Sequence, residues 1–186
     1  MINKNEARTK KLLERKKLSS DYFIKSNIAI SRKVIYLIKK KKFKNIGIYL
    51  STKFEVQTNE IIKWCFLNNI NVFVPKVLDK RNMEMVLITK DSKYVANTFK
   101  INEPFAFKSA NLNDIECIFC PLVAFDDNLN RLGMGGGFYD SFFNSHQQNY
   151  LKIGIAFDKQ KLDDILEIED HDCKLDLIIT EKKIYQ

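Results

Sequence analysis

The sequence lacks any long hydrophobic run. None of its apolar stretches approaches the roughly 20 residues that a membrane-spanning helix requires. The amino-terminal stretch MINKNEARTKKLLERKK contains no apolar core of the kind found in secretory signal peptides. We therefore expect a cytoplasmic protein that has no membrane partner.

Cysteine and histidine are scarce, which argues against three kinds of site. The four cysteines, in a chain of 186 residues without a secretion signal, are not expected to form a disulfide framework. Cys117 and Cys120 lie in an expected strand, where their odd separation points the side chains to opposite faces and prevents a shared metal ion. Neither of the two histidines lies near a serine or cysteine nucleophile motif, so a hydrolase triad is not expected.

Acidic residues are fewer than basic ones: the chain has 23 Asp and Glu and 31 Lys and Arg, which gives a net charge of +8. This excess is typical of nucleic-acid-binding proteins, an alternative that predicts binding with a steep salt dependence. The chain is, however, rich in isoleucine and asparagine as well as lysine along its whole length, which favours a general bias of amino-acid composition over a nucleic-acid site. The lysines at 39–42 end an expected helix, where cations meet the negative end of the helix dipole. We therefore expect no nucleic-acid partner.

Linkers rich in glycine, serine or proline and internal repeats are absent, so we expect one domain over residues 1–186. Apolar runs alternate with helical patterns, which predicts an α/β fold of three layers, α/β/α, with a mostly parallel central sheet. Four helices are expected: one that ends near Lys17, one that follows Asp21 and ends at about Lys42, one over about 58–68 and one that begins near Phe138. The second of these helices carries an apolar stripe formed by Phe23, Ile30, Val34, Leu37 and Ile38. The expected strands are 46–50, 70–74, which Pro75 stops, 83–88, 115–120, 152–156 and 175–180.

Glycine, of which the chain has six, is concentrated at positions 133, 135, 136 and 137 in the stretch PLVAFDDNLNRLGMGGGFYD. Glycines let the backbone approach a ligand closely and point successive N–H groups into one concavity, and a following helix adds its positive end. Arg131 before this loop can supply charge to a phosphate, and Asp140 after it can hold Mg²⁺. The loop is neither a Walker A motif nor a dinucleotide fingerprint. The pattern predicts a phosphate site; a turn that only reverses the chain is the alternative.

The segment RLGMGGGFYD resembles the RLGRGxGYYD signature of 5-formyltetrahydrofolate cyclo-ligases, also called methenyltetrahydrofolate synthetases. Lys4 and Arg8, followed by Arg15, resemble the K-x-x-x-R opening of that family. Further similar segments follow in the same order, and together they cover essentially the whole chain: YLSTKFEVQTNEII, INEPF at 101–105, KIGIAFDKQ and DHDCKLDLIITE. This ordered set of matches is more specific than any one of them.

The resemblance implies an ATP- and Mg²⁺-dependent enzyme that cyclises 5-formyltetrahydrofolate to 5,10-methenyltetrahydrofolate and releases ADP and phosphate. We expect a monomer. The implied ATP-binding residues are Lys4, Arg8, Arg131, Leu132, Gly133, Met134, Gly135, Gly136, Gly137, Phe138 and Tyr139. The implied folate-binding residues are Leu50, Glu55, Met134, Gly135, Gly136, Gly137 and Phe138. Asp140 and Asp172 are the implied metal ligands, and Arg131 and Tyr139 are the candidate catalytic residues.

Three departures from the family pattern bear on activity. Met134 stands where the family usually has arginine, so one cation is missing from the phosphate loop. Phe138 replaces the first tyrosine of the YYD triplet, and a proline usually found shortly before His171-Asp172 is absent. A phosphate-clamping arginine can contribute a factor of about 10³ or more in rate. A folate-binding relative that has lost catalysis is therefore a further alternative.

Overall fold

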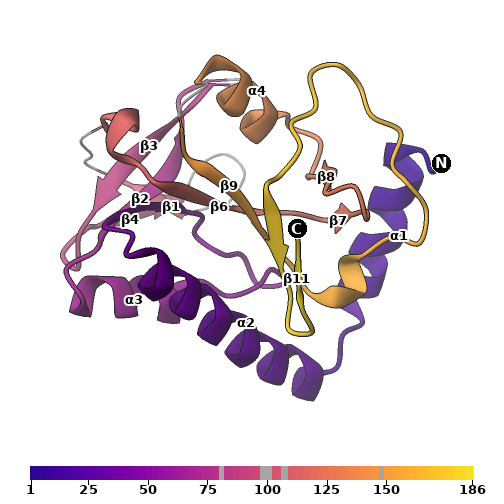
Figure 1. Cartoon of the computed structure of the whole chain (residues 1–186), viewed down its shortest axis with the longest axis horizontal. Coiled ribbons are helices and arrows are strands. Elements are labelled where there is room, and N and C mark those ends of the chain that lie inside the picture. The colour runs from indigo at the N-terminus through magenta and orange to yellow at the C-terminus, as the bar shows by residue number, and fades with distance from the viewer. Residues whose placement is uncertain (80–81, 97–101, 106–108, 147–148) are drawn as a thin grey trace.

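The computed structural model describes residues 1–79, 82–96, 102–105, 109–146 and 149–186, and Figure 1 shows a central sheet between layers of helices. The helices are α1 (Lys4–Lys16), α2 (Ser20–Lys41), α3 (Asn59–Leu67) and α4 (Phe138–Ser145). The main sheet contains β1 (Asn45–Ile48), β2 (Asn71–Val77), β3 (Met83–Ile88), β6 (Cys117–Pro121), β9 (Leu151–Ile155), β10 (Leu177–Ile179) and β11 (Ile184–Tyr185). The expected three-layer α/β fold is confirmed.

The seven strands follow the order β11-β10-β9-β6-β1-β2-β3. Parallel pairs join β10 to β9, β9 to β6, β6 to β1 and β1 to β2, and the outer strands β11 and β3 pair antiparallel. From β1 the chain continues to β2 and β3, towards one edge of the sheet, and from β6 it continues to β9, β10 and β11, towards the other edge. In sheets of this kind ligands bind beyond the carboxyl ends of the strands, where the order reverses. The fold therefore places a site where β1 and β6 end.

Apolar side chains on both faces of the sheet form two core clusters. One face packs against α2 and α3, and the predicted stripe of α2 lies there, with Ile30, Val34 and Ile38 at most 1% exposed. The other face packs against α4. Cys117 belongs to the first cluster and Cys120 to the second, so their side chains do lie on opposite faces of β6. The helix end at 39–42 is also confirmed, because Lys42 caps α2 in the left-handed conformation, with φ 59°.

The prediction that Pro75 stops the second strand is wrong. β2 continues to Val77, and Pro75 pairs with Met85 of β3. β1 pairs with β2 only as far as Phe73. Pro75 therefore lies where the strand has a partner on one side only, a position in which a sheet tolerates the missing N–H of proline.

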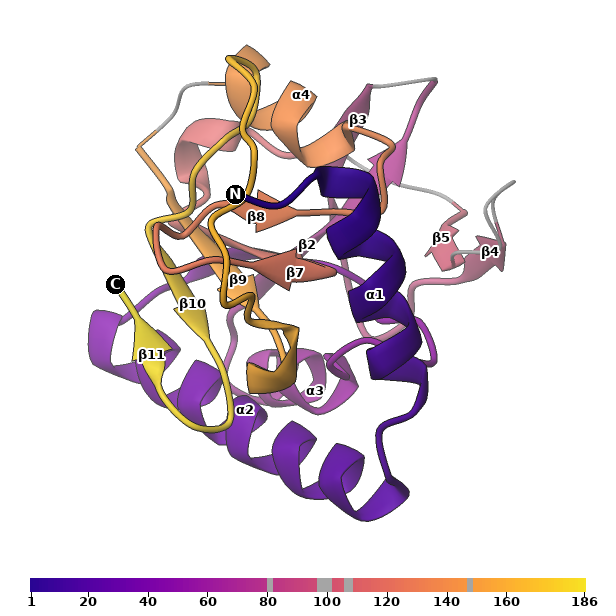
Figure 2. The same ribbon diagram turned by 90° about the vertical axis from the view of Figure 1, so that its right-hand side faces the viewer.

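Two small antiparallel pairs were not expected from the sequence. The pair β7 (Ala124–Phe125) and β8 (Arg131–Leu132) occupies the segment between β6 and the glycines, where none of the expected strands lies. The pair β4 (Tyr94–Ala96) and β5 (Asn102–Pro104) is not part of the main sheet (Figure 2), but β5 contacts β2, because Lys76 Nζ donates to the carbonyl oxygen of Pro104 at 2.8 Å. The predicted segment 101–105 has Glu103 and Pro104 in β5, and Ile101 lies outside the described residues.

The amino-terminal helix α1 lies beside the β7–β8 pair, as Figure 2 shows. Its anchor is Ala7, which is fully buried in a small apolar cluster with Ala124, Leu132, Leu162 and Leu166. This contact fixes the helix next to the segment that contains the glycines. Within the described ranges, no helix is both long and apolar enough to cross a membrane.

Candidate active site

The glycine loop, residues 133–137, connects β8 to α4. Gly135 and Gly137 have φ of 98° and 69°, in the region that other residues rarely adopt. Gly137 is the residue that precedes α4, and no side chain caps the first N–H groups of that helix. Gly135 and Gly136 are exposed. The loop therefore presents backbone and the positive end of a helix to solvent, as the sequence predicts for a phosphate site.

Arg131 and Asp140, which flank the loop in sequence, meet beneath it. Arg131 Nη2 lies 2.7 Å from Asp140 Oδ1, and the side chains are 3% and 18% exposed. The backbone N–H of Cys173 also donates to Asp140 Oδ1, at 3.2 Å. Asp140 is thus held by a buried cation and by an amide from a distant segment. The guanidinium of Arg131 is oriented by this pair rather than mobile on the surface.

Helix α1 brings two cations to the same loop. Arg8 Nε donates to the carbonyl oxygen of Gly133 at 3.0 Å, and a Cβ atom on Gly135 would lie 3.6 Å from Arg8 Cζ. Lys4 Nζ lies 2.6 Å from Asp172 Oδ2 and 3.4 Å from Glu169 Oε1. The structure therefore brings Lys4 and Arg8 next to the loop and the second acid, although their contact with ATP stays a prediction.

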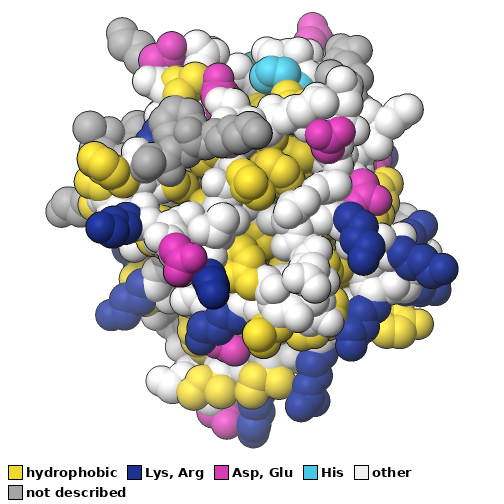
Figure 3. Space-filling model, turned by 90° about the vertical axis from the view of Figure 1, so that its left-hand side faces the viewer, with side chains coloured by type: hydrophobic (Ala, Val, Ile, Leu, Met, Phe, Trp, Pro, Cys, Tyr) yellow, Lys and Arg dark blue, Asp and Glu magenta, His cyan; other side chains and the backbone are white. Residues whose placement is uncertain are grey.

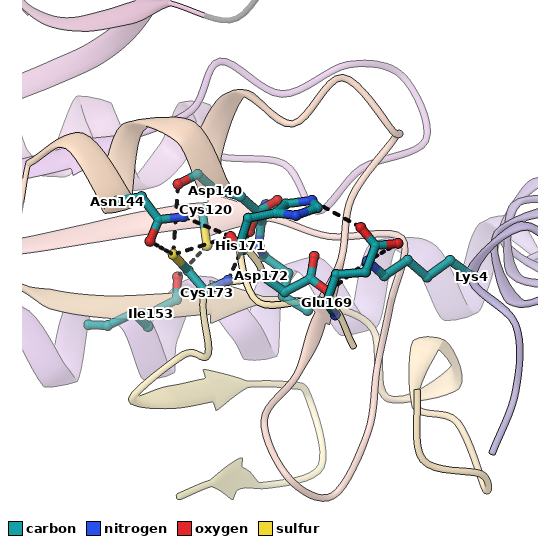
Figure 4. A network of polar contacts seen from close by, with 10 residues as sticks. Lys4, Cys120, Asp140, Asn144, Ile153, Glu169, His171, Asp172 and Cys173 are labelled. Atoms are coloured by element: carbon teal, nitrogen blue, oxygen red, sulfur yellow. Dashed lines mark hydrogen bonds and ion pairs between the residues drawn. The ribbon is translucent and has the colours of Figure 1, made fainter. Parts of the chain in front are cut away.

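The segment that contains Asp172 closes over Asp140 (Figure 4). Asn144 Nδ2 of α4 donates to the carbonyl oxygen of His171 at 2.7 Å, and Cys173 Sγ lies 3.3 Å from Asn144 Oδ1. Because Cys173 N–H binds Asp140 and Cys173 follows Asp172, the two predicted metal ligands are linked through one residue.

The Lys4–Asp172 pair should make stability depend on pH. Burial raises the pKa of Asp172, but hydrogen bonds from Lys4 and from the N–H of Glu169 lower it more, so its net pKa is below the ordinary value. An acid with a lowered pKa contributes stability above its unfolded pKa of about 4, and this contribution is lost as the pH falls through the folded pKa. Lys4→Met should therefore reduce the free energy of unfolding by about 0.5–1 kcal/mol at pH 6, and this deficit should shrink towards pH 3.

Urea unfolding of the wild-type protein and of Lys4→Met between pH 3 and 7 measures this difference. Lys25→Met is the matched control, because the Lys25–Asp21 pair is 74% and 73% exposed and should contribute less. A deficit for Lys4→Met that is independent of pH would contradict the pairing with Asp172.

Glu55 and Leu50, the predicted folate contacts, follow β1. Glu55 Oε2 accepts hydrogen bonds from Thr52 N, at 2.8 Å, and from Thr52 Oγ1, at 2.9 Å. This turn fixes the direction of the carboxylate. Burial lowers the pKa of Arg15, and the nearby charge of Glu55 opposes the change, so the carboxylate and this guanidinium lie close to each other.

The phenol of Tyr139 also lies near Glu55. Burial raises the pKa of Tyr139 well above its ordinary value, and the negative charge of Glu55 raises it further, whereas Arg131 lowers it. Tyr139 therefore keeps its proton at neutral pH and acts as a hydrogen-bond donor rather than as a base. The Arg131 Cζ atom lies 5.4 Å from the centre of the Tyr139 ring. This contact ties the tyrosine to the arginine beneath the loop.

Three buried polar atoms in the described part of the chain lack a hydrogen-bond partner, and all three lie in this region: Nε of Arg15, Nε of Arg131 and Oη of Tyr139. Leaving such a donor unpaired costs about 1–3 kcal/mol. In native proteins an unpaired buried polar group calls for an explanation, and a role in a binding or catalytic site is one. The three donors are therefore candidates for hydrogen bonds to a bound ligand.

Arg15 follows Lys4 and Arg8 in the family's opening pattern but is not among the residues predicted to bind ATP or folate. It is 8% exposed and donates from Nη1 to the carbonyl oxygen of Leu122, just beyond β6, at 3.4 Å. Its spacing was the available signal, because Lys4, Arg8 and Arg15 recur at intervals that place them on one face of a helix. Leu132, by contrast, is a predicted ATP-binding residue, but its side chain is 3% exposed and belongs to the apolar cluster around Ala7. Only the backbone of Leu132 can therefore face a nucleotide.

A cavity of about 430 Å³ opens beside the Glu55 turn. Leu50, Thr52 and Ile62 contribute to its walls, together with Tyr94 of β4. The volume of this cavity falls in the range of small-molecule sites. Seen from the left-hand side of Figure 1, the surface of the molecule shows hydrophobic side chains in a hollow, with Lys and Arg side chains beside it (Figure 3).

Asp140 and Asp172 are the side chains to consider as ligands of Mg²⁺. Among the residues that the structure describes, no three His, Cys, Asp or Glu side chains are grouped as ligands of one ion. Mg²⁺ usually takes only one or two carboxylates and completes its shell with water and phosphate oxygens. Asp140 and Asp172 are partly exposed, at 18% and 19% for their side chains, and suit such a role.

Comparison with known proteins identifies the family. The sequence profile described as the 5-formyltetrahydrofolate cyclo-ligase family matches residues 1–181. The chain belongs to the 5-formyltetrahydrofolate cyclo-ligase family. The resemblance found in the sequence is thereby confirmed, and so is the class of enzyme, a ligase of folate metabolism.

Relatives of this cyclo-ligase family member match it along most of their length. A 5-formyltetrahydrofolate cyclo-ligase of Mycoplasma genitalium is 32% identical over 181 residues, which cover 96% of this chain and 98% of the relative. A probable 5-formyltetrahydrofolate cyclo-ligase of Schizosaccharomyces pombe is 33% identical over 181 residues, 89% of each chain.

Two solved structures share the fold of this cyclo-ligase family member. The 5,10-methenyltetrahydrofolate synthetase of Mycoplasma pneumoniae has a TM-score of 0.80 at 27% identity and covers 96% of this chain and 98% of its own. The synthetase of Aquifex aeolicus has a TM-score of 0.85 at 27% identity and covers 98% of this chain and 92% of its own.

Proposed function

We propose that this protein cyclises 5-formyltetrahydrofolate to 5,10-methenyltetrahydrofolate and converts ATP to ADP and phosphate. The observation that carries the proposal is the glycine loop held between the Arg131–Asp140 pair below it and Arg8 beside it. Family membership supplies the substrate class, and this arrangement supplies a place for the phosphates.

The reaction needs activation because an N5-formyl group is an amide, whose carbon is a poor electrophile. The formyl oxygen attacks the γ-phosphorus of ATP, and the bond from that phosphorus to ADP breaks. N10 of the folate then attacks the activated carbon and loses its proton. The carbon–oxygen bond breaks, inorganic phosphate leaves and the methenyl ring remains.

The side chains of the site suit phosphoryl transfer, in which catalysis is mostly positioning and stabilisation of charge. The N–H groups of the loop and the positive end of α4 receive phosphate oxygens, and Lys4 and Arg8 add cationic charge. Arg131, fixed by Asp140, holds the transferred group. No protein nucleophile or obligate base is required, which agrees with a protonated Tyr139 that donates to the formyl or phosphate oxygen.

Mg²⁺ bound by Asp140 and Asp172 would neutralise charge on the phosphate oxygens. Both acids are oxygen donors at the edge of the loop, and both carry cationic partners in this structure. Lys4 is the cation that a metal ion can displace more readily, because the Lys4 side chain is 23% exposed, whereas the Arg131 side chain is 3% exposed.

Glu55 recognises the pterin ring. A pterin carries a ring N–H and an amino group side by side, and a carboxylate can accept from both. The turn at Thr52 aims this carboxylate, and Leu50 packs at the cavity wall next to it. We further propose that the protein acts as a monomer in the cytoplasm, where ATP and reduced folates are available, and without a nucleic-acid partner.

A specific observation keeps a second candidate function open. Met134 is 64% exposed on the loop, at the position where the family signature has arginine. A protein that binds the folate tightly without turning it over would match this departure. Arg8 is the cation that compensates under the main proposal, because it already lies against Gly135.

The test mixes the protein with Mg-ATP and 5-formyltetrahydrofolate and follows the absorbance of the methenyl product. We expect turnover by the wild-type protein and an increase in kcat/KM for ATP of about tenfold in Met134→Arg, because a phosphate-clamping cation is restored. Met134→Gln, which adds no charge, is the matched control and should change little. Tight folate binding without product in either the wild-type protein or Met134→Arg would establish the second candidate instead.

A further inference from the structure

Arg15 is a buried cation that the fold leaves without a charged partner. It is 8% exposed, and the ion pairs of the described residues do not include it, whereas the buried Arg131 is paired with Asp140. Its buried Nε has no hydrogen-bond partner. Burying a charge that is neither paired nor fully hydrogen-bonded destabilises a fold. Such a group calls for an explanation, and a ligand that completes its hydrogen bonds is one.

The one hydrogen bond that the Arg15 side chain makes to a described residue contributes little to the fold. Arg15 Nη1 donates to the carbonyl oxygen of Leu122 at 3.4 Å, a long and therefore weak contact. The same oxygen already accepts a hydrogen bond from Nε2 of the buried Gln160, at 2.5 Å. Helix α1 is anchored instead by Ala7 in its apolar cluster. Removing the guanidinium therefore leaves the main contacts of this region in place.

The guanidinium of Arg15 lies at the carboxyl ends of β1 and β6. Leu122, which it contacts, directly follows β6, and Tyr49 directly follows β1. Burial raises the pKa of Tyr49 well above its ordinary value, the charges of Glu55 and Tyr139 raise it further, and the charge of Arg15 opposes them. Glu55, Tyr139 and Arg15 therefore surround this one phenol, at the point of the sheet where ligands bind in folds of this kind.

Two arginines thus approach the site from different sides. Arg131 lies beneath the glycine loop, on the nucleotide side, with the ring of Tyr139 against it. Arg15 lies close to Glu55, on the side proposed for the folate. In the proposed reaction the phosphoryl group moves from the nucleotide to the formyl oxygen of the folate. A cation on the folate side faces this group after its transfer.

We propose that Arg15 is a second catalytic arginine, which donates from its Nε edge to the phosphate on the formyl oxygen and stabilises the departure of that phosphate. The inference rests on the proposed function. When N10 has attacked the activated carbon, the carbon–oxygen bond breaks and its electron pair goes to the phosphate oxygen, while N10 gives its proton to water. Negative charge develops on the leaving phosphate, and a guanidinium with unpaired donors on one edge stabilises it.

Measuring ADP and the methenyl product in the same reaction tests this step. We expect the wild-type protein to form them in equal amounts. Arg15→Met should turn over 5-formyltetrahydrofolate about 10²-fold more slowly. Its ratio of ADP to methenyl product should exceed one, because water hydrolyses the waiting intermediate back to 5-formyltetrahydrofolate and phosphate. The midpoint of urea unfolding should not fall, since an unpaired buried charge is removed.

Arg15→Lys is a second variant, which keeps the charge but loses the planar edge of donors, so its rate and its ratio should lie between those of the wild-type protein and Arg15→Met. The matched control is Lys16→Met, which removes one positive charge from the adjacent, exposed position of α1 and should change neither the rate nor the ratio.

Three results, each with an active wild-type protein, would overturn the inference and leave the proposed function intact. The first is an unchanged rate in Arg15→Met. The second is a slower rate with the ratio still at one, which together with a lower unfolding midpoint would assign Arg15 to the fold. The third is an equal effect of Lys16→Met, which would show a long-range field. A wild-type protein that forms neither ADP nor methenyl product would overturn the proposed function, and the inference with it.

Discussion

Replacing Asp140 with asparagine should lower turnover of 5-formyltetrahydrofolate by about 10³-fold or more. The amide retains an oxygen that can accept from Cys173 N–H and from Arg131, but it removes the negative charge that orients the guanidinium and that would bind Mg²⁺ in the proposed mechanism. Steady-state rates at saturating Mg-ATP measure the effect. Asp127→Asn is the matched control, because Asp127 is 61% exposed, pairs with Lys161 away from the loop and should keep full activity.

A structural effect accompanies this loss and has to be separated from it. Neutralising Asp140 leaves Arg131, which is 3% exposed, without its charged partner. The free energy of unfolding should therefore fall by about 1–3 kcal/mol, and activity should be assayed well below the unfolding midpoint. Undiminished turnover in Asp140→Asn, with the expected loss of stability, would remove Asp140 from the metal role.

Arg131→Met should have the second large effect, on stability as well as on rate. Breaking a buried ion pair by removing one member costs about 3–5 kcal/mol, and the partial exposure of Asp140 places this variant near the lower end, about 3 kcal/mol. Urea unfolding measures the loss, and the methenyl assay should show a decrease in turnover of about 10³-fold.

The double variant Arg131→Met with Asp140→Leu distinguishes the two roles of the pair. Replacing both members of a buried pair with apolar side chains is often neutral for stability, so most of the unfolding free energy should return. Activity should not return, because the phosphoryl group has lost its cation. Recovery of activity together with stability would mean that the pair is purely structural.

The layers of the fold followed from local patterns, whereas the strand order did not. The apolar stripe of α2 and the apolar runs of the long strands are periodic patterns that can be recognised within a short stretch of sequence. Two-residue strands such as β7 and β8 are too short to show a period, and pairing partners are chosen by contacts distant in sequence. The effect of Pro75 cannot be predicted from a local pattern for the same reason, since whether a proline ends a strand depends on which neighbours the strand has.

The residues of the site likewise fall into those that a local sequence pattern predicts and those that only the fold brings together. The glycine loop and its flanking residues were predicted because their chemistry is contiguous in sequence. The pairing of Lys4 with Asp172 and the hydrogen bond from Cys173 to Asp140 join segments far apart in the chain, and no local pattern indicates them. Arg15 lies between these cases, because helical spacing aligns it with Arg8 but only the fold shows that its guanidinium is buried near Glu55.

The central claim is that the backbone between Arg131 and Asp140 binds the phosphates of ATP. Amide chemical shifts, recorded while a non-hydrolysable ATP analogue with Mg²⁺ is titrated, test it residue by residue. The account predicts that the signals of Gly133, Gly135, Gly136 and Gly137 move together with those of Lys4 and Arg8. Saturable binding of the nucleotide that leaves the loop signals in place and shifts another part of the chain would contradict it.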